Sequence, residues 1–542
     1  MKTRREFLKL AAAFGCAAMV SESAAQRPGG TWRKPNIVYV LADDLGYGDV
    51  ACLNPRGKIP TPNIDKLATE GKVFTDAHSV SAVCSPSRYG ILTGRYSWRS
   101  RLQRYIVECY WKPLIPPERL TVPALLRQHG YHTACIGKWH LGWNWPEGLA
   151  GSHSTVKSDA PATPATPEQQ AVWRRVFSQP ITGGPTSCGF DEYFGVDMPN
   201  WPPYCWIEND RTLGIPSEML PSRLLGNNQA NIPGPALADW KLEAILPTLT
   251  DRACRYIGKR AEDGKPFFLY FSLTSPHTPL AVNDDWKGKS GLNLYADFVM
   301  ETDAMVGRVL RALDEHGLAD NTLVIFTSDN GCAPYIGVKD LERKGHFPSA
   351  QFRGYKSDAW DGGHRVPFIV RWPGRVSAGT TCAQMVCQTD LMATCAELLG
   401  VNLPDNAGED SFSILPLLLG SDRPVRDHVI SHSIDGKFAI RDGRWKLLLC
   451  PGSGGWTMKD ADAAKQGLPP VQLYDMKSDP GEKINLCDRY PETVKAMVRL
   501  LERLVADGRS TPGPPQRNDV PVDIWKYEST PSGANARKTP SS

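Results

Sequence analysis

The feature that most limits how this chain can fold is a series of short apolar runs that alternate with helical stretches. The run KPNIVYVLADD is almost continuously apolar and β-branched, as expected of a strand buried on both faces. Four further runs of this kind are HTACIGKWH, KPFFLYFSL, TLVIFTSDNG and RVPFIVRWPG. Helical patterns occupy 62–70, 122–128 and about 292–315. This alternation predicts an α/β fold in which a large mixed, mainly parallel sheet is covered by helices on both faces.

The remaining segments differ in composition and in the periodicity of their apolar residues. Residues 142–237 are rich in Pro, Gly and Trp and have weak periodicity, which predicts a loop-rich insertion. From 425 to 515, short alternating strands precede a helix at about 491–506 and predict a small carboxyl-terminal α+β subdomain with an antiparallel sheet. Residues 516–542 are expected to form a disordered tail. A Pro/Gly linker at 26–34 and a large domain at 35–424 complete the expected organisation.

The first 25 residues resemble an export signal. Arg4 and Arg5 precede a modest apolar run at 10–20 and a small-residue site at 23–25. This arrangement resembles a twin-arginine signal peptide, which predicts export of the folded chain by the twin-arginine machinery to the periplasm or beyond. The apolar run is too short to span a bilayer, so no stable membrane insertion is expected. Lipidation of Cys16 is an alternative that the sequence leaves open.

The charge of the chain gives no reason to expect nucleic acid as a partner. Of the formal net charge of +4, about +2 belongs to the signal segment, so the mature chain is nearly neutral. Fourteen cysteines are present, and twelve remain when Cys16 and Cys84 are set aside. These are enough for several disulfides in an oxidising compartment, although the sequence does not give their pairing.

Polar residues follow four of the predicted strands directly. Because the carboxyl ends of parallel strands meet at one edge of a sheet, we expect these residues to lie close together. They are Asp43, Asp44, Lys138, His140, Ser275, His277, Asp329 and Asn330. Three carboxylates and an amide suit Ca²⁺ or Mg²⁺, and the cationic side chains around them would attract sulfate or phosphate. Each feature also has a structural alternative, such as a turn at a strand end or a buried histidine.

Cys84 opens the segment CSPSRYGILTGR, at the start of a plausible helix with Arg88 one turn later. A helix amino terminus and a nearby arginine would favour a reactive thiolate. The same cysteine could equally be a small buried side chain or half of a disulfide. The local sequence does not separate these alternatives.

Six sequence blocks resemble the type I sulfatases, the formylglycine-dependent family of the alkaline phosphatase superfamily. CSPSRYGILTGR resembles the family signature, Cys-x-Pro-Ser-Arg followed by Leu-Thr-Gly-Arg. The blocks NIVYVLADDLGYGD, GYHTACIGKWHLG, SPHTPL, SDNG and FRGYKSDAWDGGHRVPFIVRWPG match in the family's order, and the similarity extends to LYDMKSDPGEKINL. The chain is similar to exported bacterial arylsulfatases and polysaccharide sulfatases. This resemblance implies an alkaline phosphatase-like fold with 35–424 as the catalytic domain. Asp361 stands where many family members have glutamate.

The resemblance also implies the chemistry of Cys84. In the family this cysteine is oxidised to formylglycine by a maturation enzyme, so Cys84 would be the precursor of an aldehyde. The hydrated aldehyde carries two hydroxyls, of which one can attack sulfur and the other can then expel sulfate. By the same resemblance, the hydrate shares a Ca²⁺ ion with the side chains of Asp43, Asp44, Asp329 and Asn330.

The other matched residues have roles in the family that the resemblance transfers to this sequence. Arg88 would anchor the hydrate, and Lys138 would contact both the hydrate and the sulfate. His140 would accept the proton that drives the elimination, and His277 and Lys356 would face the ester oxygen of the leaving alcohol. The implied activity is that of a sulfuric ester hydrolase. The alternatives are a phosphonate or phosphate ester hydrolase of the same superfamily and a non-catalytic sulfated-glycan binder.

The sequence says less about which alcohol the sulfate is removed from than about the reaction itself. Export and the resemblance favour a sulfated carbohydrate, with galactose or N-acetylgalactosamine sulfate as candidates, and aryl sulfates are expected to be cleaved as well. Aromatic and polar residues of the insertion could contact sugar rings, or the aromatics could pin the loops to the scaffold. They are Trp143, Trp145, Trp201, Tyr204, Trp206, Glu208, Asn209 and Asp210.

Overall fold

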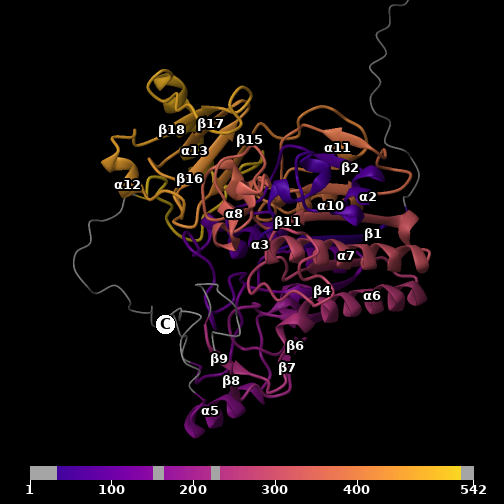
Figure 1. The fold of residues 1–542 in the computed structure, drawn as a ribbon. Helices are drawn as coiled ribbons and strands as arrows, with labels where there is room; N and C mark the ends of the chain where they lie inside the picture. The colour runs from indigo at the N-terminus through magenta and orange to yellow at the C-terminus, as the bar shows by residue number, and fades with distance from the viewer. Residues whose placement is uncertain (1–32, 150–163, 221–231, 527–542) are drawn as a thin grey trace, which may run out of the picture. The chain divides into compact units, whose positions relative to one another are not determined.

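A computed structural model describes residues 33–149, 164–220 and 232–526 of the chain. Its centre is a ten-stranded sheet in the order β13-β2-β12-β11-β1-β10-β4-β5-β6-β7 (Figure 1). The five central strands are parallel to one another. They are β11 (Thr322–Ser328), β1 (Asn36–Ala42), β10 (Phe267–Ser272), β4 (His132–Lys138) and β5 (Glu192–Val196). The predicted large, mainly parallel sheet is therefore confirmed.

The sheet becomes antiparallel on both sides of this parallel centre. β12 (Phe368–Arg371), from the run RVPFIVRWPG, is antiparallel to β11 and to β2 (Lys72–Phe74), which pairs with β13 (Thr380–Cys382). On the other side, β6 (Trp206–Glu208) runs antiparallel to β5 and to β7 (Arg211–Leu213). The five central strands therefore share one carboxyl edge, and the outer strands extend the sheet on either side.

Helices cover both faces of the sheet, as the alternation of strands and helices predicts. On one face, alternate residues of β1, such as Val38 and Val40, pack in a core with helices that include α6 and α7, which lie side by side (Figure 1). The helices of this face are α2 (Pro62–Thr69), α6 (Ile245–Asp263) and α7 (Leu294–Glu315). Those of the other face are α3 (Cys84–Thr93), α4 (Val122–Gln128) and α10 (Leu391–Leu399). The predicted helical stretches correspond to α2, α4 and α7.

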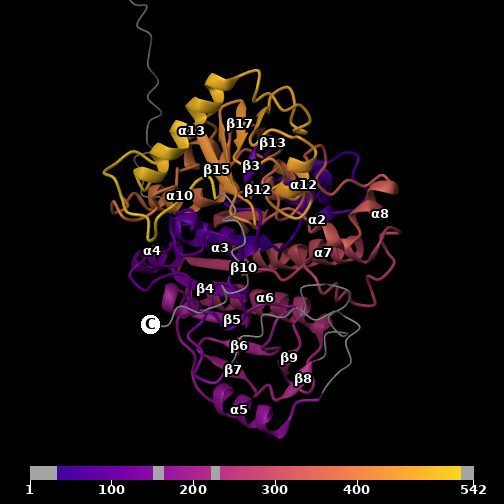
Figure 2. The same cartoon turned by 90° about the vertical axis from the view of Figure 1, so that its left-hand side faces the viewer.

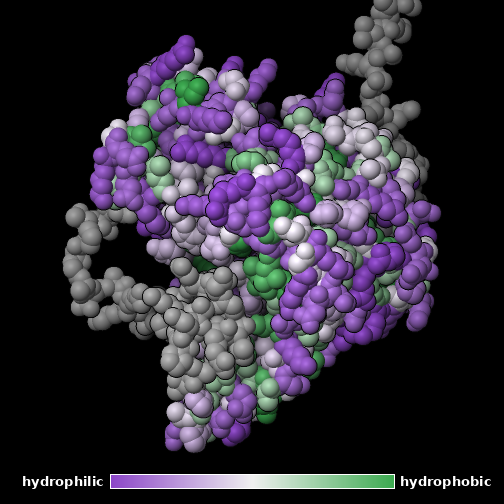
Figure 3. Space-filling model, viewed as in Figure 1, coloured by the Kyte–Doolittle hydropathy of each residue, from purple (hydrophilic) through white to green (hydrophobic). Residues whose placement is uncertain are grey.

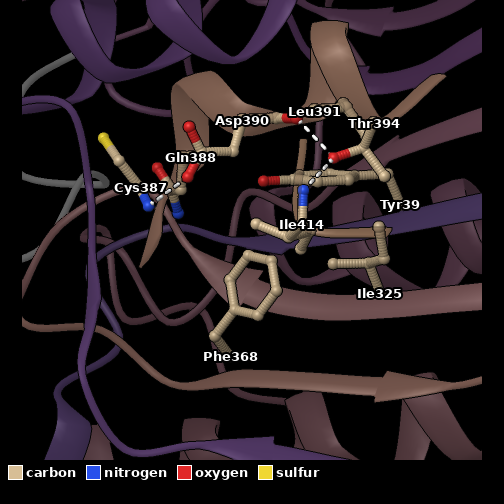
Figure 4. A pocket seen from close by; sticks show the side chains of 9 residues that line it. All are labelled: Tyr39, Ile325, Phe368, Cys387, Gln388, Asp390, Leu391, Thr394 and Ile414. Atoms are coloured by element: carbon tan, nitrogen blue, oxygen red, sulfur yellow. Dashed lines mark hydrogen bonds between the residues drawn. The ribbon is translucent and has the colours of Figure 1, made fainter. Parts of the chain in front are cut away.

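The face covered by α10 is closely packed. Tyr39 of β1 and Ile325 of β11 point toward Leu391 and Thr394 of α10 (Figure 4). The space that remains there is about 10 Å³, roughly the room that one water molecule needs. This cavity is too small to hold a substrate. Short elements elsewhere are α8 (Val338–Arg343), α9 (Asp361–His364), α11 (Leu415–Leu418), α12 (Asp460–Lys465), β3 (Ala77–His78) and β14 (Val386–Cys387).

Residues 142–237 contain more regular structure than the expected loop-rich insertion. They carry α5 (Pro167–Phe177), strands β5 to β7, and a hairpin of β8 (Glu218–Leu220) and β9 (Gly234–Ala236). The run EYFGV of β5 pairs in parallel with β4 in the main sheet. At Gly195 of β5, an added Cβ would meet the Gly137 carbonyl oxygen at 1.8 Å, so the close strand pairing requires glycine. A short strand with a glycine has no clear apolar pattern, which is why the expectation of loops was wrong here.

A second sheet of four antiparallel strands forms the carboxyl-terminal region (Figure 2). Its strands are β15 (His428–His432), β16 (Phe438–Asp442), β17 (Trp445–Leu448) and β18 (Gln472–Asp475). The amphipathic helix α13 (Pro491–Ala506) packs on this sheet through Met497, Leu501 and Leu504. The predicted small antiparallel sheet with a following helix is confirmed. The described residues from Pro35 onward cluster as one compact unit, so both sheets belong to the same unit.

Part of the expected disordered tail packs against the rest of the chain. Arg99 Nη1 donates to Asn518 Oδ1 at 3.0 Å, Arg95 pairs with Asp519 at 3.1 Å, and Ile524 is buried. The expectation of disorder was therefore wrong for 516–526, and 527–542 lie outside the described residues. The segment is held by ion pairs and hydrogen bonds to distant residues and by Ile524, which packs in the core of the second sheet. These contacts with remote residues are not evident from the segment's own sequence.

The described cysteines form no disulfides. All thirteen cysteines in the described ranges are free thiols, and eleven of them are buried. Buried thiols of this kind pack as small apolar side chains. Although the cysteines are numerous enough for several disulfides, none forms in the described part of the chain.

The visible surface is mostly hydrophilic, and its hydrophobic residues gather in a strip through the middle of the face in Figure 3. Among the described residues, no helix combines the length and the apolar character needed to cross a bilayer. The expected signal at 1–25, with Cys16, lies outside the described residues.

Replacing Arg99 tests how far the carboxyl-terminal segment depends on one buried ion pair. Arg99 Nη2 lies 2.8 Å from Asp410 Oδ1 and Nε lies 2.9 Å from Oδ2, with both side chains fully buried. Arg99→Leu leaves the Asp410 carboxylate buried without this partner, so the free energy of unfolding is expected to fall by about 3–5 kcal/mol. Equilibrium unfolding in denaturant measures the change.

Asp519→Asn is the matched control. The Asp519 side chain is 39% exposed, and its partner Arg95 keeps Glu409 at 3.1 Å. The expected loss is therefore about 1 kcal/mol or less. Equal losses in the free energy of unfolding for the two variants would show that burial does not make the Arg99–Asp410 pair more stabilising than the exposed pair.

Candidate active site

Two acidic pairs meet at the carboxyl edge of the parallel strands. Asp43 and Asp44 follow β1, and Asp329 and Asn330 follow its parallel neighbour β11. The Asp44 backbone N–H donates to Asp329 Oδ1 at 3.2 Å, and Asn330 Nδ2 donates to Asp44 Oδ1 at 2.7 Å. Asp44 has φ +66°, in the left-handed region that few non-glycine residues adopt. All four side chains are buried, so the polar cluster lies inside the protein and not on an open turn.

Three basic side chains balance the three carboxylates. Arg88 comes from α3, Lys138 ends β4, and Lys356 lies in the loop between α8 and α9. The closest pairs are Lys138 Nζ with Asp43 Oδ2 at 2.7 Å, Lys356 Nζ with Asp44 Oδ1 at 2.6 Å, and Arg88 Nη2 with Asp329 Oδ2 at 2.7 Å. Burial alone would raise the pKa of Asp43, but the surrounding positive groups, Lys138 first among them, hold that pKa well below its usual range.

Cys84 is the first residue of α3 and lies beside this cluster. Its Sγ is 3.8 Å from Asp43 Oδ1, and Arg88 follows one helical turn later on the same side of α3. Burial raises the pKa of the Cys84 thiol to about 12, although Lys138 and Lys356 act in the opposite direction. The unmodified thiol is therefore protonated at neutral pH, which does not fit a reactive thiolate. Cys84 is also not part of a disulfide.

The acidic cluster offers oxygen ligands for a divalent cation. Ligand atoms of four residues lie within 4.8 Å of one another, namely those of Asp43, Asp44, Cys84 and His277. Asn330 Oδ1 is buried and has no hydrogen-bond partner among the described residues. Burial and the neighbouring Asp43 carboxylate raise the pKa of Asp329 to about 7. The basic side chains therefore do not fully compensate the negative charge of the carboxylates, and a further cation would be favourable there. Carboxylate and amide oxygens are the ligands that Ca²⁺ and Mg²⁺ prefer.

His140 lies two residues beyond β4, and among the described residues only one of its two ring nitrogens has a hydrogen-bond partner. Its Nε2 is 3.0 Å from the Val107 carbonyl oxygen, which can only accept, so Nε2 carries the proton. Nδ1 is buried and has no hydrogen-bond partner within 33–149, 164–220 and 232–526. Burial, together with Lys138 and Arg88, lowers the pKa of His140 well below its ordinary value. The ring is therefore neutral and can accept a proton at Nδ1.

His277 lies beyond the end of β10 and close to Asp44. Its Nε2 is 3.6 Å from Asp44 Oδ2, and its Nδ1 contacts the Thr278 carbonyl oxygen. Burial lowers the pKa of His277 to about 4, although Asp44 opposes the shift. The structure thus brings together side chains that lie up to 312 positions apart in the sequence. The assembled residues are Asp43, Asp44, Cys84, Arg88, Lys138, His140, His277, Asp329, Asn330 and Lys356.

Asp197 lies at the same edge and was not identified from the sequence. It follows β5 directly, and its Oδ1 accepts hydrogen bonds at 3.2 Å from the His140 backbone N–H and from Trp143 Nε1. Burial raises the pKa of Asp197 to about 6 in spite of these donors. Recognition of β5 as a fifth parallel strand would have identified it, because the carboxyl-end rule selects the residue that follows Val196.

The aromatic residues expected at a sugar site mostly hold the insertion to the scaffold. Trp143, Trp201 and Tyr204 are buried. Trp206 is half-buried and stacks on Phe194 with ring centroids 5.0 Å apart. Trp145 packs on its aromatic neighbours, Glu208 pairs with Arg252, and Asn209 Oδ1 accepts the Tyr193 backbone N–H at 2.9 Å. Of the two alternatives, the structure favours the one in which these aromatics pin the loops.

A second group of potential metal ligands is neutralised by basic side chains. It consists of His78, Asp361 and His364. Lys446 Nζ lies 2.7 Å from Asp361 Oδ1, and Arg365 Nη2 lies 2.7 Å from Asp361 Oδ2. This group has a single carboxylate, and two fixed positive charges already contact it, whereas the Asp43 cluster has three carboxylates for three basic side chains. The group therefore does not suit a metal cation. Asp361, in the position of the family's usual glutamate, is part of this structural ion network.

Comparison with known proteins agrees with this geometry. The sulfatase family profile matches residues 35–401, and the profile of the carboxyl-terminal region of N-sulphoglucosamine sulphohydrolase matches 356–507. An N-acetylgalactosamine-6-O-sulfatase from Bacteroides thetaiotaomicron is 35% identical over 512 residues, which cover 90% of this chain and 96% of that protein. Arylsulfatase A from Homo sapiens is 31% identical over 508 residues, covering 89% and 90%.

Solved structures show the same relationship. A structure described under the metabolism of multiple glycosaminoglycans by Bacteroides thetaiotaomicron has a TM-score of 0.74 and 31% identity, and covers 87% of this chain and 99% of that one. The crystal structure of i-CgsB in complex with k-i-k-neocarrahexaose has a TM-score of 0.62 and 25% identity, covering 87% and 92%. With a family match over more than half of its length, this chain belongs to the sulfatase family and is a sulfuric ester hydrolase.

Proposed function

We propose that this sulfatase cleaves sulfate monoesters with a formylglycine made from Cys84, assisted by a bound Ca²⁺ ion. The observation that carries the proposal is the position of Cys84, whose Sγ lies 3.8 Å from Asp43 among three carboxylates and three basic side chains. Its thiol, with a pKa raised to about 12, is a poor nucleophile as it stands. Oxidation by a formylglycine-generating maturation enzyme converts it to an aldehyde, whose hydrate offers two hydroxyls.

The acidic cluster holds the cation in this proposal. Asp43, Asp44, Asp329 and Asn330 supply its oxygen ligands, and Asn330 Oδ1 is the buried atom that lacks another partner among the described residues. When bound, Ca²⁺ would lower the cost of deprotonating the attacking hydroxyl and offset the negative charge of the ester. Arg88 anchors the hydroxyls of residue 84, and Lys138 binds the sulfate oxygens.

Proton transfer falls to the two histidines and to Lys356. His140 accepts a proton at its free Nδ1 from the second hydroxyl of residue 84, so that the carbonyl re-forms and sulfate leaves. Burial lowers the pKa of His277 to about 4, whereas Asp44 holds the pKa of Lys356 well above its ordinary value in spite of burial. With Lys356 protonated and His277 neutral, Lys356 supplies the positive charge that faces the leaving oxygen, and His277 is the neutral group beside it.

Substitution of Cys84 tests the nucleophile. Cys84→Ala cannot form the aldehyde, so kcat is expected to fall by at least about 10⁴-fold while the fold is kept. In wild-type protein from a host with the maturation enzyme, the peptide that contains residue 84 is expected to be about 18 Da lighter than the thiol form and to react with an aldehyde probe. Full activity in Cys84→Ala, or in protein that carries only the thiol, would rule out this nucleophile.

Asn330→Ala tests the cation site with a readout that does not depend on turnover. Excess Ca²⁺ at about 100 times its dissociation constant would stabilise the wild type by about 2.7 kcal/mol, seen as a higher Tm after a chelator is removed. Loss of the amide oxygen should abolish most of this shift. Asn36→Ala is the control, because Asn36 is a buried asparagine at the opposite end of β1. The same Ca²⁺ response in both variants would contradict the assignment.

The substrate of this proposal is a sulfated carbohydrate, with N-acetylgalactosamine or galactose sulfate as the first candidates. Two comparisons support it, since one relative is an N-acetylgalactosamine-6-O-sulfatase and one structural neighbour holds a neocarrahexaose. The insertion also contributes to an open pocket of about 480 Å³, whose lining includes Tyr110, Trp173, Pro202 and Glu168. An apolar and aromatic lining with a few polar groups is typical of a ligand site.

A substrate screen separates this activity from its alternatives. Sulfated N-acetylgalactosamine, sulfated galactose and an aryl sulfate are compared with the aryl phosphate and a phosphonate ester. We expect kcat/KM for sulfates to exceed that for the phosphorus esters by at least about 100-fold, because the family profile and the relatives that match this chain are those of sulfatases. Turnover of the phosphonate alone would favour the second hydrolase class, and binding without turnover would favour a glycan binder.

Export completes the proposal. The twin-arginine signal at 1–25 directs the folded chain to the periplasm, where polysaccharide fragments are accessible. Such a route carries proteins that have already folded in a reducing compartment. The free, mostly buried cysteines of the described residues are compatible with folding before export.

A further inference from the structure

We propose that Ser85 is a positioning residue that sets the distance between residue 84 and the imidazole of His140. The inference rests on the proposed function, because that function makes His140 the acceptor of a proton from residue 84. The family signature leaves the position after cysteine open, so it assigns no role to Ser85. The contacts of Ser85 give it one.

His140 depends on other segments for its position. It lies beyond the end of β4 with φ +55°, a conformation that costs a non-glycine residue about 1–2 kcal/mol. Its backbone is held by Asp197, whose Oδ1 accepts the His140 N–H at 3.2 Å. Its ring is held by Val107, whose carbonyl oxygen accepts from Nε2 at 3.0 Å. Trp201 packs edge-on against the ring at 6.2 Å.

Val107 is in turn held by Ser85. The Val107 backbone N–H donates to Ser85 Oγ at 3.0 Å, and both residues are buried. Val107 lies in a stretch, 102–113, that has no helix or strand, so no regular hydrogen-bond ladder fixes its backbone. The backbone N–H of Val107 thus bonds to Ser85, and its carbonyl oxygen bonds to the His140 ring. Val107 therefore links Ser85 to His140 through two hydrogen bonds.

This connection joins the two ends of the proposed proton transfer. Ser85 is bonded covalently to residue 84, and α3 holds both at its first turn. A shift of Ser85 Oγ or its loss would free the Val107 N–H and, with it, the carbonyl that orients His140. Because a displacement of about 1 Å can cost about 100-fold in rate, a hydroxyl that touches no substrate can still govern the chemical step.

Kinetics of Ser85→Ala test the proposal. With rates expressed per aldehyde-bearing molecule, kcat for an aryl sulfate is expected to fall by about 10–100-fold, while KM changes by less than about 3-fold because Arg88 and Lys138 are untouched. Ser79→Ala is the matched control. Ser79 is also buried, lies five residues before Cys84, and donates from Oγ to the Ser81 carbonyl at 2.7 Å, so its loss is expected to leave kcat unchanged.

Ser85→Thr and Ser85→Val extend the test if the alanine variant does not fold. The two side chains have nearly the same shape, and only threonine keeps the hydroxyl. Threonine is expected to retain kcat to within about 3-fold and valine to lose it as alanine does. Equal kcat values for the Thr and Val variants, or a fall in Ser85→Ala no larger than in Ser79→Ala, would overturn the proposal.

Crystal structures of the wild type and Ser85→Ala supply a readout that needs no turnover. In the variant, the distance from His140 Nε2 to the Val107 oxygen is expected to lengthen, or His140 to adopt a second conformer. An unmoved His140 would overturn the proposal even if kcat falls. If wild-type protein with its aldehyde cleaves no sulfate ester, the proposed mechanism has failed, and the crystal structures still decide whether Ser85 positions His140.

Discussion

Three carboxylates buried at one point are the constraint on which the rest of the site depends. Asp43, Asp44 and Asp329 are brought together by the parallel pairing of β1 and β11, and a buried carboxylate without compensation costs several kcal/mol. The fold therefore has to deliver positive charge from elsewhere, and Arg88, Lys138 and Lys356 do so at 2.6–2.7 Å. The same basic groups suit an anionic sulfate ester. In the proposed mechanism, stabilisation of the fold and recognition of substrate thus use one set of charges.

The carboxyl-terminal sheet is part of this arrangement because it holds the segment that carries Lys356. The Ser357 N–H donates to the Ala82 carbonyl at 2.7 Å, and the Ser357 carbonyl accepts the Ile434 N–H at 3.0 Å. Lys446 of β17 bonds Asp361 on the far side of the same loop. The loop is therefore fixed between the segment that precedes α3 and the connection from β15 to β16. The profile match over 356–507 spans both this loop and the second sheet.

Three site segments share an unfavourable backbone conformation. Asp44, His140 and Ser357 have φ values of +66°, +55° and +85° although none is glycine. Such residues persist only where surrounding contacts over-determine them, and they are frequent at functional sites. Here each contact partner is remote in sequence, as Asp329 is for Asp44, Asp197 for His140 and Ala82 for Ser357. The strain marks the places where tertiary structure, and not local preference, sets the geometry.

The sequence by itself determined the fold class and four of the five central strands, and it predicted most residues of the candidate site. Continuous apolar runs reported the buried strands, and the rule that ligands lie at the carboxyl ends of parallel strands selected Asp43, Lys138, His277 and Asp329 before any distance was known. Only the tertiary structure decided the rest. β5 has a weak pattern because glycine allows its close pairing, so Asp197 and its bond to His140 could not be foreseen. The free thiols, the packed segment at 516–526 and the path from Ser85 to His140 also depend on contacts between residues far apart in the chain, which local sequence patterns do not encode.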